Sequence, residues 1–475
     1  MPLELSRQGA TLGTSSNAAS WQPELLRLGE LLIMQTQKLS LKKWCTAVAF
    51  GLAITSIGFI PVYAASYASP DGSSSKKKDE KNEYPNATRR DPKNDLSEKG
   101  SKDLNKAFDL LDKNQFDAAQ ELLAKVASDS HSGKYGQAKA LQGEAQIKQE
   151  KDDYDGAIQL IQQAIAIDAL PNREQFAAMY QIAQLQMQQE KYQDALTSLD
   201  AWQKATLTEK AEVYALRGNS YYRLEKYPEA IEALNKAISL APDKPNDSWT
   251  EILMASYFET KQFDEAGKIA QAQLAKDPNN LKLIQRLAAV YINAKQDQKA
   301  LDLLAAAKTK GLITTEDDYK HLAQLYANAD KPKDGAPVLE EGLSKGIVKP
   351  TYDNYKLLGD MYAQSEDDTH ALAAYAKASP LAKDGNVDYQ RGYILFYSDH
   401  SKEAKEAFSQ AISKGGLRQQ GEAYLLRGDA ENDLGESAAA IADYEKATGF
   451  PSSKPMADQR LKALRGGVKI QKKKK

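Results

Sequence analysis

The chain has 475 residues, of which 27% are charged and 42% are hydrophobic, and its 63 basic and 65 acidic residues leave a net charge of −2. That balance produces no overall positive field, so we expect no nucleic-acid partner. Cys45 is the only cysteine, which excludes a scaffold held together by disulfides.

Residues 1–64 are predicted to be an N-terminal extension followed by a signal peptide. An uncharged apolar stretch covers residues 46–62, and the small side chains of Val62 and Ala64 stand at the −3 and −1 positions of a signal-peptidase site. A positive region precedes this stretch and consists of Lys38, Lys42 and Lys43. The three-part pattern predicts export, with cleavage after Ala64.

Two features of this segment leave alternatives open. The pattern begins just after Met34, so we take Met34 as the start, with residues 1–33 either an over-extended gene start or an unusually long n-region. The apolar stretch is near the lower limit for crossing a bilayer, so an uncleaved inner-membrane anchor is the alternative to a free periplasmic protein. Cys45 precedes the apolar core, so we expect no lipoprotein attachment. In either case the repeats that follow face the periplasm.

Residues 65–102 are rich in Ser, Lys, Asp, Asn and Pro and almost free of aliphatic side chains. A segment of this composition buries too little apolar surface to offset the entropy lost on ordering. We therefore expect a disordered polar linker here.

From residue 103 to residue 450 a small residue recurs at intervals of about 34 to 38 residues. In most copies an apolar residue follows four and seven positions later. The recurring residues are Ala119, Ala157, Ala195, Ala230, Ala266, Ala300, Gly335, Ala371, Ala404 and Ala440. This period predicts a stack of helix–turn–helix units, and no alternating β-branched run supports a sheet. We therefore predict an all-α fold.

The clearest copy covers residues 211–244. Its pattern residues stand at positions 4, 8, 11, 20, 24, 27 and 32 and are Tyr214, Gly218, Tyr221, Ala230, Leu234, Ala237 and Pro242. This copy resembles the tetratricopeptide repeat (TPR) family. The resemblance implies a right-handed superhelical α-solenoid of about ten repeats, in which Gly218 and Ala230 let the two helices of one repeat cross closely.

Other copies depart from this pattern. The first three lack several pattern residues and are spaced more widely, which implies longer helices. In one copy Gly335 follows a Lys-Pro-Lys-Asp turn, so we expect a short or bent second helix there. Residues 451–468 are predicted to form a capping helix, with Leu461 and Leu464 on its apolar side, and residues 469–475 a basic tail.

No motif for catalysis or metal binding is visible. The four histidines sit in four different repeats, and none has a partner at i+4 or a nearby cysteine: His131, His321, His370 and His400. The acidic pairs fall at predicted helix starts or turns: Asp152-Asp153, Asp317-Asp318 and Asp367-Asp368. Carboxylates there are expected to cap helices rather than to serve as acid–base pairs. We therefore expect no enzyme, cofactor, metal or small-molecule substrate.

In TPR proteins the first helix of each repeat lines a concave groove that binds peptides. Carried over to this sequence, the resemblance implies a partner-binding set of Asn219, Tyr222, Arg223, Phe258, Lys282, Gln285, Arg286, Lys320, Gln324, Lys356, Tyr389, Tyr393 and Phe396. The middle of this set is polar with lysines, which suits an acidic or C-terminal peptide. The later part is aromatic, which suits apolar side chains.

The carboxylate clamp of chaperone-binding TPR proteins is matched only in part. Asn219, Lys282 and Arg286 fit it, whereas Ala215 and Ile252 hold the other two places. Recognition of a Glu-Glu-Val-Asp type C-terminus is therefore not expected.

These features predict a non-enzymatic interaction scaffold of the bacterial cell envelope with a protein or peptide partner. The chain resembles exported TPR proteins, some of which accompany TonB/ExbB-type systems or outer-membrane assembly and secretion machinery. The alternative is a membrane-anchored regulator of envelope polysaccharide or peptidoglycan enzymes. Membrane contact is expected only through the signal or anchor segment or the basic tail.

Overall fold

The computed structural model describes residues 83–93, 95–242 and 246–466. The predicted signal peptide and basic tail lie outside these residues. Within the described part the chain forms 21 α-helices and two 3-10 helices and no strand, so the all-α prediction is confirmed. None of the helices described there is long and apolar enough to cross a bilayer.

The chain divides into two compact units, with a boundary between Lys276 and Asp277. The first unit contains α2 (Glu98–Asp112), α3 (Phe116–Ser128), η2 (Ser130–Ser132), α4 (Lys134–Glu150), α5 (Tyr154–Ala166), α6 (Asn172–Gln188), α7 (Tyr192–Thr206), α8 (Ala211–Arg223), α9 (Tyr227–Leu240), α10 (Asp247–Glu259) and α11 (Phe263–Lys276). The second unit contains α12 (Leu281–Asn293), α13 (Asp297–Thr309), α14 (Glu316–Asn328), α15 (Pro332–Ser344), α16 (Tyr352–Gln364), α17 (Asp368–Ala378), η3 (Ser379–Leu381), α18 (Asn386–Tyr397), α19 (Ser401–Lys414), α20 (Gln420–Asp433), α21 (Ser437–Ala447) and α22 (Lys454–Arg465).

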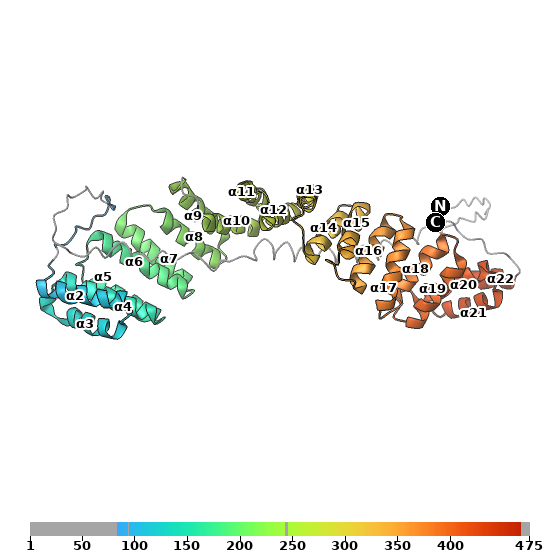
Figure 1. Cartoon of the computed structure of the whole chain (residues 1–475), viewed down its shortest axis with the longest axis horizontal. Coiled ribbons are helices and arrows are strands. Elements are labelled where there is room, and N and C mark those ends of the chain that lie inside the picture. The colour runs from blue at the N-terminus through green and yellow to red at the C-terminus, as the bar shows by residue number, and fades with distance from the viewer. Residues whose placement is uncertain (1–82, 94, 243–245, 467–475) are drawn as a thin grey trace, which may run out of the picture. The chain divides into compact units, whose positions relative to one another are not determined.

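Within each unit, consecutive helices pack as hairpin pairs, from α2 with α3 to α20 with α21 (Figure 1). One residue with positive φ stands in the turn inside every pair. It is glycine only at Gly435, and elsewhere φ lies between 56° and 64° at Asn114, Asp152, Glu190, Glu225, Lys261, Lys295, Asp330, Glu366 and Asp399. A side chain in this region costs about 1 kcal/mol or more, so packing of the two helices holds each turn.

The recurring small residues lie where the two helices of a pair meet. All nine alanines of the period are 0% exposed, and Gly335 is buried as well. At Gly218 of α8, a Cβ would lie only 2.5 Å from Cγ of Leu234 on α9. The repeat prediction is thus confirmed at the residues on which it rested.

Helix lengths agree with one expectation and contradict the shortness, though not the bend, expected at Gly335. In the early pairs, α4 and α6 each have 17 residues, whereas α8 has 13, which accounts for the wider spacing there. The second helix that contains Gly335 is not short, because α15 has 13 residues like α13. Pro332 opens α15 at a position where its missing N–H costs nothing.

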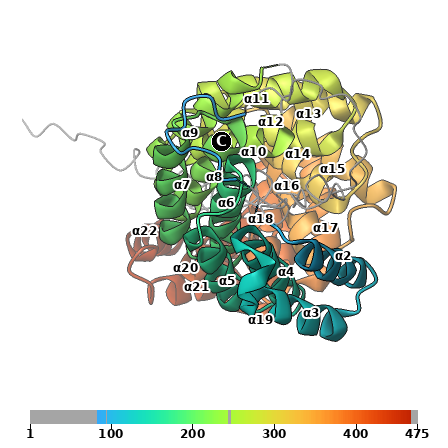
Figure 2. The ribbon, with the colours of Figure 1, turned by 90° about the vertical axis from the view of Figure 1, so that its left-hand side faces the viewer.

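The predicted linker over residues 65–102 is wrong from residue 83 onward. Helix α2 already begins at Glu98, and residues 83–93 with Asp95, here called the strap, lie against α4, α6, α7 and α8 (blue in Figure 2). At Gly133 (φ 79°) a Cβ would lie 2.1 Å from the carbonyl oxygen of Asp95, so glycine permits this close approach.

Tyr84 is the apolar anchor of the strap and is 6% exposed. Its ring stands edge-on to Phe176, with centroids 4.9 Å apart, and to Trp202, at 6.1 Å. Lys210 Nζ lies 4.3 Å from the ring centroid and donates to the Tyr84 hydroxyl at 2.9 Å. Glu83 forms an ion pair with the same Lys210. One aromatic side chain with well-matched partners therefore orders a segment whose composition predicts disorder.

Arg89 is the polar anchor of the strap. Its guanidinium donates to Asp168 Oδ1 at 2.7 Å, to Asn172 Oδ1 at 2.7 Å and to the backbone oxygen of Leu170 at 2.8 Å. Asn172 Nδ2 donates back to the Arg89 backbone oxygen at 2.9 Å. These bonds fix the strap on the loop that leads into α6.

The strap also supplies caps that the helices beneath it lack. Asp91 accepts a hydrogen bond from the N–H of Asn172 at 2.5 Å, and Asp95 accepts from the N–H groups of Lys134 and Tyr135, both at 2.9 Å. The N-cap side chains of α4, α6 and α8 make no such bond, whereas α10, α12, α14 and α16 are capped by their own Asn or Thr. A capping carboxylate stabilises a helix by about 1 kcal/mol.

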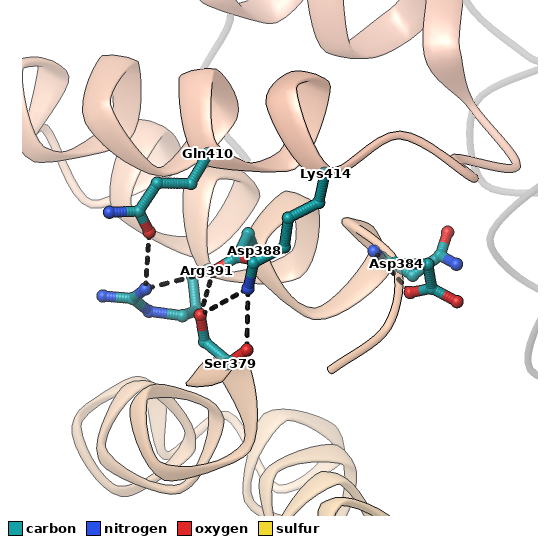
Figure 3. A network of polar contacts seen from close by, with 7 residues as sticks. Ser379, Asp384, Asp388, Arg391, Gln410 and Lys414 are labelled. Atoms are coloured by element: carbon teal, nitrogen blue, oxygen red, sulfur yellow. Dashed lines mark hydrogen bonds and ion pairs between the residues drawn. The ribbon is translucent and has the colours of Figure 1, made fainter. Parts of the chain in front are cut away.

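A buried ionic network joins η3, α18 and α19 (Figure 3). Asp388 is 0% exposed and accepts from Lys414 Nζ and from the Ser379 hydroxyl, each at 2.6 Å. Arg391 lies 3.3 Å from the same carboxylate and bridges to Gln410. The buried charge of Asp388 is thus matched by two cations, and a buried carboxylate is stable only when it is paired in this way.

Helix α22 lies where a capping helix was predicted over residues 451–468. Leu461 is 8% exposed and packs with Tyr444 of α21, and Leu464 is partly buried against the same cluster. This helix covers the apolar side that the last pair would otherwise expose.

Candidate protein-binding surface

The predicted partner-binding set stands on the first helices of the pairs, and each unit carries its own part. The members in the first unit lie on α8 and α10 and are Asn219, Tyr222, Arg223 and Phe258. The members in the second unit lie on α12, α14, α16 and α18 and are Lys282, Gln285, Arg286, Lys320, Gln324, Lys356, Tyr389, Tyr393 and Phe396.

Four members of the set are buried and therefore are not part of a contact surface. Asn219, Arg286, Tyr389 and Phe396 are 6%, 7%, 5% and 4% exposed. Tyr389 and Phe396 belong to the core cluster that contains Phe408 of α19, whose ring centroid lies 5.9 Å from that of Tyr389. These four residues close the packing between helices, so their assignment to partner contact is corrected.

The remaining members in the first unit contact neighbouring side chains. Arg223 donates to the hydroxyl of Tyr192 from Nε at 2.9 Å and from Nη2 at 2.6 Å. The two aromatic members each pack against the ring that opens the second helix of the pair: Tyr222 on Tyr227 with centroids 5.6 Å apart, and Phe258 on Phe263 at 5.3 Å. Arg223 and these rings thus link and brace the helix pairs.

The lysines of the second unit are largely neutralised. Lys356 Nζ lies 2.6 Å from Asp360 Oδ2, and Lys320 Nζ lies 4.0 Å from Glu316 Oε1, each pair one helical turn apart. Lys282 is exposed. Since two of the three lysines have a carboxylate beside them, this surface attracts an acidic peptide less than the lysines alone suggest.

The polar members of the second unit hold α12 against α14. Gln285 Nε2 donates to Asp318 Oδ1 at 2.5 Å, and Asp318 also accepts from the Thr315 hydroxyl at 2.7 Å. Burial lowers the pKa of the neighbouring His321 to about 4. Gln324 Oε1 is buried and accepts no hydrogen bond within the described part of the chain. Gln285 therefore joins two repeats.

Tyr389, Tyr393 and Tyr397 stand four residues apart on α18 and face Glu422 of α20. The ring centroids are 6.4 Å apart from Tyr389 to Tyr393 and 4.6 Å apart from Tyr393 to Tyr397. Tyr389 donates a hydrogen bond to the Glu422 carboxylate. Tyr393, Tyr397 and Glu422 are half-buried, and burial raises the pKa of Glu422. Tyr393, Tyr397 and Glu422 are named the tyrosine–Glu422 surface, and the buried Tyr389 bonds to its carboxylate.

Asp429 stands two turns after Glu422 on α20 in a closely related setting. It is 8% exposed and accepts from Arg460 Nε of α22 at 2.9 Å and from the Tyr444 hydroxyl at 2.8 Å. Burial raises its pKa, and Arg460 and Tyr444 oppose that shift. Asp429 therefore shows how a buried carboxylate on this helix is satisfied by a cation from the next helix.

The set predicted from the sequence contains only part of this surface. It includes Tyr393 and the buried Tyr389 and lacks Tyr397 and Glu422. The spacing of the three tyrosines is visible in the sequence and places them on one helix face. Nothing in the sequence places α20 and α22 beside that face.

All three acidic pairs stand at helix starts, as predicted. Asp153 caps α5 by accepting from the N–H of Gly156 at 3.0 Å, and Asp367 caps α17 by accepting from the N–H of His370 at 3.1 Å. Asp317 and Asp318 lie in the first turn of α14, where carboxylates favour the helix dipole, and Asp318 also joins α12 to α14. Among the residues the structure describes, no group of three or more His, Cys, Asp and Glu side chains is placed to hold a metal ion.

Ten helix pairs with a buried small residue at each crossing define a helical-repeat solenoid protein. Family models of the tetratricopeptide repeat match residues 211–244, 257–311 and 389–454. Three segments of the chain are therefore tetratricopeptide repeats, a repeat typical of protein-interaction scaffolds that generally lack catalytic activity.

Several solved structures are similar to the chain. A tetratricopeptide repeat protein from Parabacteroides merdae is 15% identical, with 57% of this chain and 99% of that chain covered and a TM-score of 0.34. The C-terminal part of a TPR repeat-containing protein from Cytophaga hutchinsonii is 15% identical over 59% and 99%, with a TM-score of 0.34. MamA from Desulfovibrio magneticus is 19% identical over 38% and 99%, with a TM-score of 0.32. No curated protein matches the chain.

Proposed function

We propose that this scaffold acts as a non-enzymatic adaptor in the bacterial cell envelope, where the first helices of its repeats bind peptide segments of partner proteins. In this proposal it is an accessory to a TonB/ExbB-type system or to outer-membrane assembly or secretion machinery. The binding role is carried by one observation. On α18 and α20, the rings of Tyr393 and Tyr397 and the carboxylate of Glu422 are partly exposed, and within the described residues no ion pair joins Glu422 to a cation.

The location rests on the sequence of residues 38–64, which has the charge, length and small residues of an export signal. A fusion of residues 34–70 to alkaline phosphatase, which is active only outside the cytoplasm, should be active. Replacing Lys42 and Lys43 by glutamate should reduce that activity, because the positive region orients insertion. Recovery of the full chain in the cytosol would contradict the proposed location.

N-terminal sequencing of the mature protein separates the free protein from the membrane-anchored alternative. A mature chain that starts at Ala65 supports a free periplasmic adaptor, whereas an intact signal that sediments with inner membranes supports an anchored regulator. Cross-linking in cells, followed by identification of captured proteins, then tests the adaptor role. Capture of polysaccharide or peptidoglycan enzymes alone would favour the regulator.

A further inference from the structure

The tyrosine–Glu422 surface contains a charge that the fold leaves unmatched. Glu422 is half-buried, and the one side chain that contacts its carboxylate through a hydrogen bond is the hydroxyl of Tyr389. Within the described residues no ion pair joins Glu422 to a Lys, Arg or His. Partial removal of a carboxylate from water is unfavourable unless a cation or further donors replace the lost hydration. A positively charged ligand would supply that cation.

The rings beside Glu422 favour the same kind of ligand. Tyr393 and Tyr397 lie 4.6 Å apart between centroids and are half-buried, so part of each ring remains open next to the carboxylate. Ring faces attract cations, and the methylene stems of lysine and arginine cover apolar surface while the head group reaches a carboxylate. An acidic side chain would be repelled, and an apolar side chain would bury Glu422 further without neutralising it.

The neighbouring Asp429 provides a comparison within the same helix. The Arg460 guanidinium lies 2.9 Å from its carboxylate. The positive charge of Arg460 also opposes the rise that burial causes in the pKa of Tyr397. The pattern of tyrosine, carboxylate and cation is thus complete at Asp429. At Glu422 the same helix presents tyrosine and carboxylate, and the cation is the component that the chain does not provide.

We propose that the tyrosine–Glu422 surface binds a lysine or arginine side chain of an extended segment from a partner protein. This inference rests on the proposed adaptor function and specifies the partner as basic, whereas the lysines of the predicted set had indicated an acidic one. The basic tail of the chain itself, residues 469–475, carries the same chemistry and is the competing occupant.

The probe for a test is a short fluorescein-labelled peptide of alternating lysine and serine, titrated with the full-length protein in fluorescence anisotropy. Glu422→Gln should weaken binding by about tenfold, since it removes a charge-assisted hydrogen bond. Glu445→Gln, which removes an exposed carboxylate on α21, should leave binding unchanged and controls for overall charge. A matching glutamate–serine peptide should not bind.

Variants of Tyr393 separate a contact from a structural role. Tyr393→Phe keeps the ring and should bind the lysine peptide like the wild type, whereas Tyr393→Leu should bind about fivefold more weakly. Circular dichroism of each variant shows whether the helices are retained. Equal affinity for wild type, Glu422→Gln and Tyr393→Leu would overturn the proposal, even if cross-linking still recovers envelope partners and the adaptor function stands.

A full-length variant with lysines 472–475 replaced by glutamine decides between the two occupants. Binding of the peptide to both this variant and the wild type, with the same dependence on Glu422, supports a partner segment. If only the tail variant binds the peptide, the tail fills the site and the proposal of a partner segment is wrong.

Discussion

Replacing Tyr84 by alanine should release the strap from the first unit. Removal of a buried aromatic side chain costs about 3–5 kcal/mol, and Tyr84 is 6% exposed between Phe176 and Trp202. Because Tyr84 stands on the strap and not in a repeat helix, we take the lower value of about 3 kcal/mol. That change raises the population with a released strap by about 100-fold.

Hydrogen exchange measured by mass spectrometry reports this release at known amides. In Tyr84→Ala, exchange should accelerate at the N-terminal amides that Asp91 and Asp95 cap, those of Asn172, Lys134 and Tyr135. Helices α12, α14 and α16 have their own caps and should exchange as in the wild type. Tyr84→Phe keeps the ring and loses only the bond from Lys210, so its effect should be about 1 kcal/mol.

Two results would refute this reasoning. If Tyr84→Ala leaves exchange at Lys134 and Asn172 unchanged, Arg89 and the caps hold the strap without its aromatic anchor. If exchange accelerates equally in α12 to α21, the substitution destabilises the whole chain rather than the strap.

Three further outcomes are expected. Ala230→Leu should overpack the crossing of α8 and α9 and lower the free energy of unfolding by about 1–3 kcal/mol in urea denaturation, and no change would contradict the close crossing. Lys414→Met should lower the free energy of unfolding by about 3 kcal/mol, because Asp388 stays buried with Arg391 as its remaining cation. Lys414→Arg keeps a cation beside Asp388 and should lower it much less. The pKa of His321 is about 4 in the folded chain, so its imidazole binds a proton more weakly there than in the unfolded chain. The free energy of unfolding should therefore fall as the pH drops from about 6.5 to 4. In His321→Gln this fall should be smaller by about 2–3 kcal/mol, which thermal unfolding across that pH range would measure.

The sequence predicted the parts of the structure that depend on local spacing. A small residue such as Ala230 recurs with the repeat, and its burial follows from the helix crossing that the period implies. The neutralised lysines were also readable, because Lys356 and Asp360 stand one turn apart. The burial of Tyr389 depends on Phe408, which the fold brings to it from the next helix.

The strap could not be predicted because its partners are distant in sequence. Tyr84 contacts Phe176 and Trp202, which are about a hundred residues further along the chain. The average composition of residues 65–102 is polar, so it does not reveal that one aromatic residue anchors part of the segment. The N-caps of α4 and α6 are Gly133 and Pro171, which cannot cap with a side chain, but several other helices lack such a cap too, so this feature did not identify the strap.

The order of contacts along the strap has a mechanical consequence. Moving along the chain from residue 83, the strap meets α6, α7 and the residue before α8 through Tyr84, then the loop before α6 through Arg89, and then α4 through Asp95, before α2 begins. A pull on the N-terminal segment would therefore load the anchor of Tyr84 and Lys210 first. The early repeats would therefore carry little tension until that anchor yields.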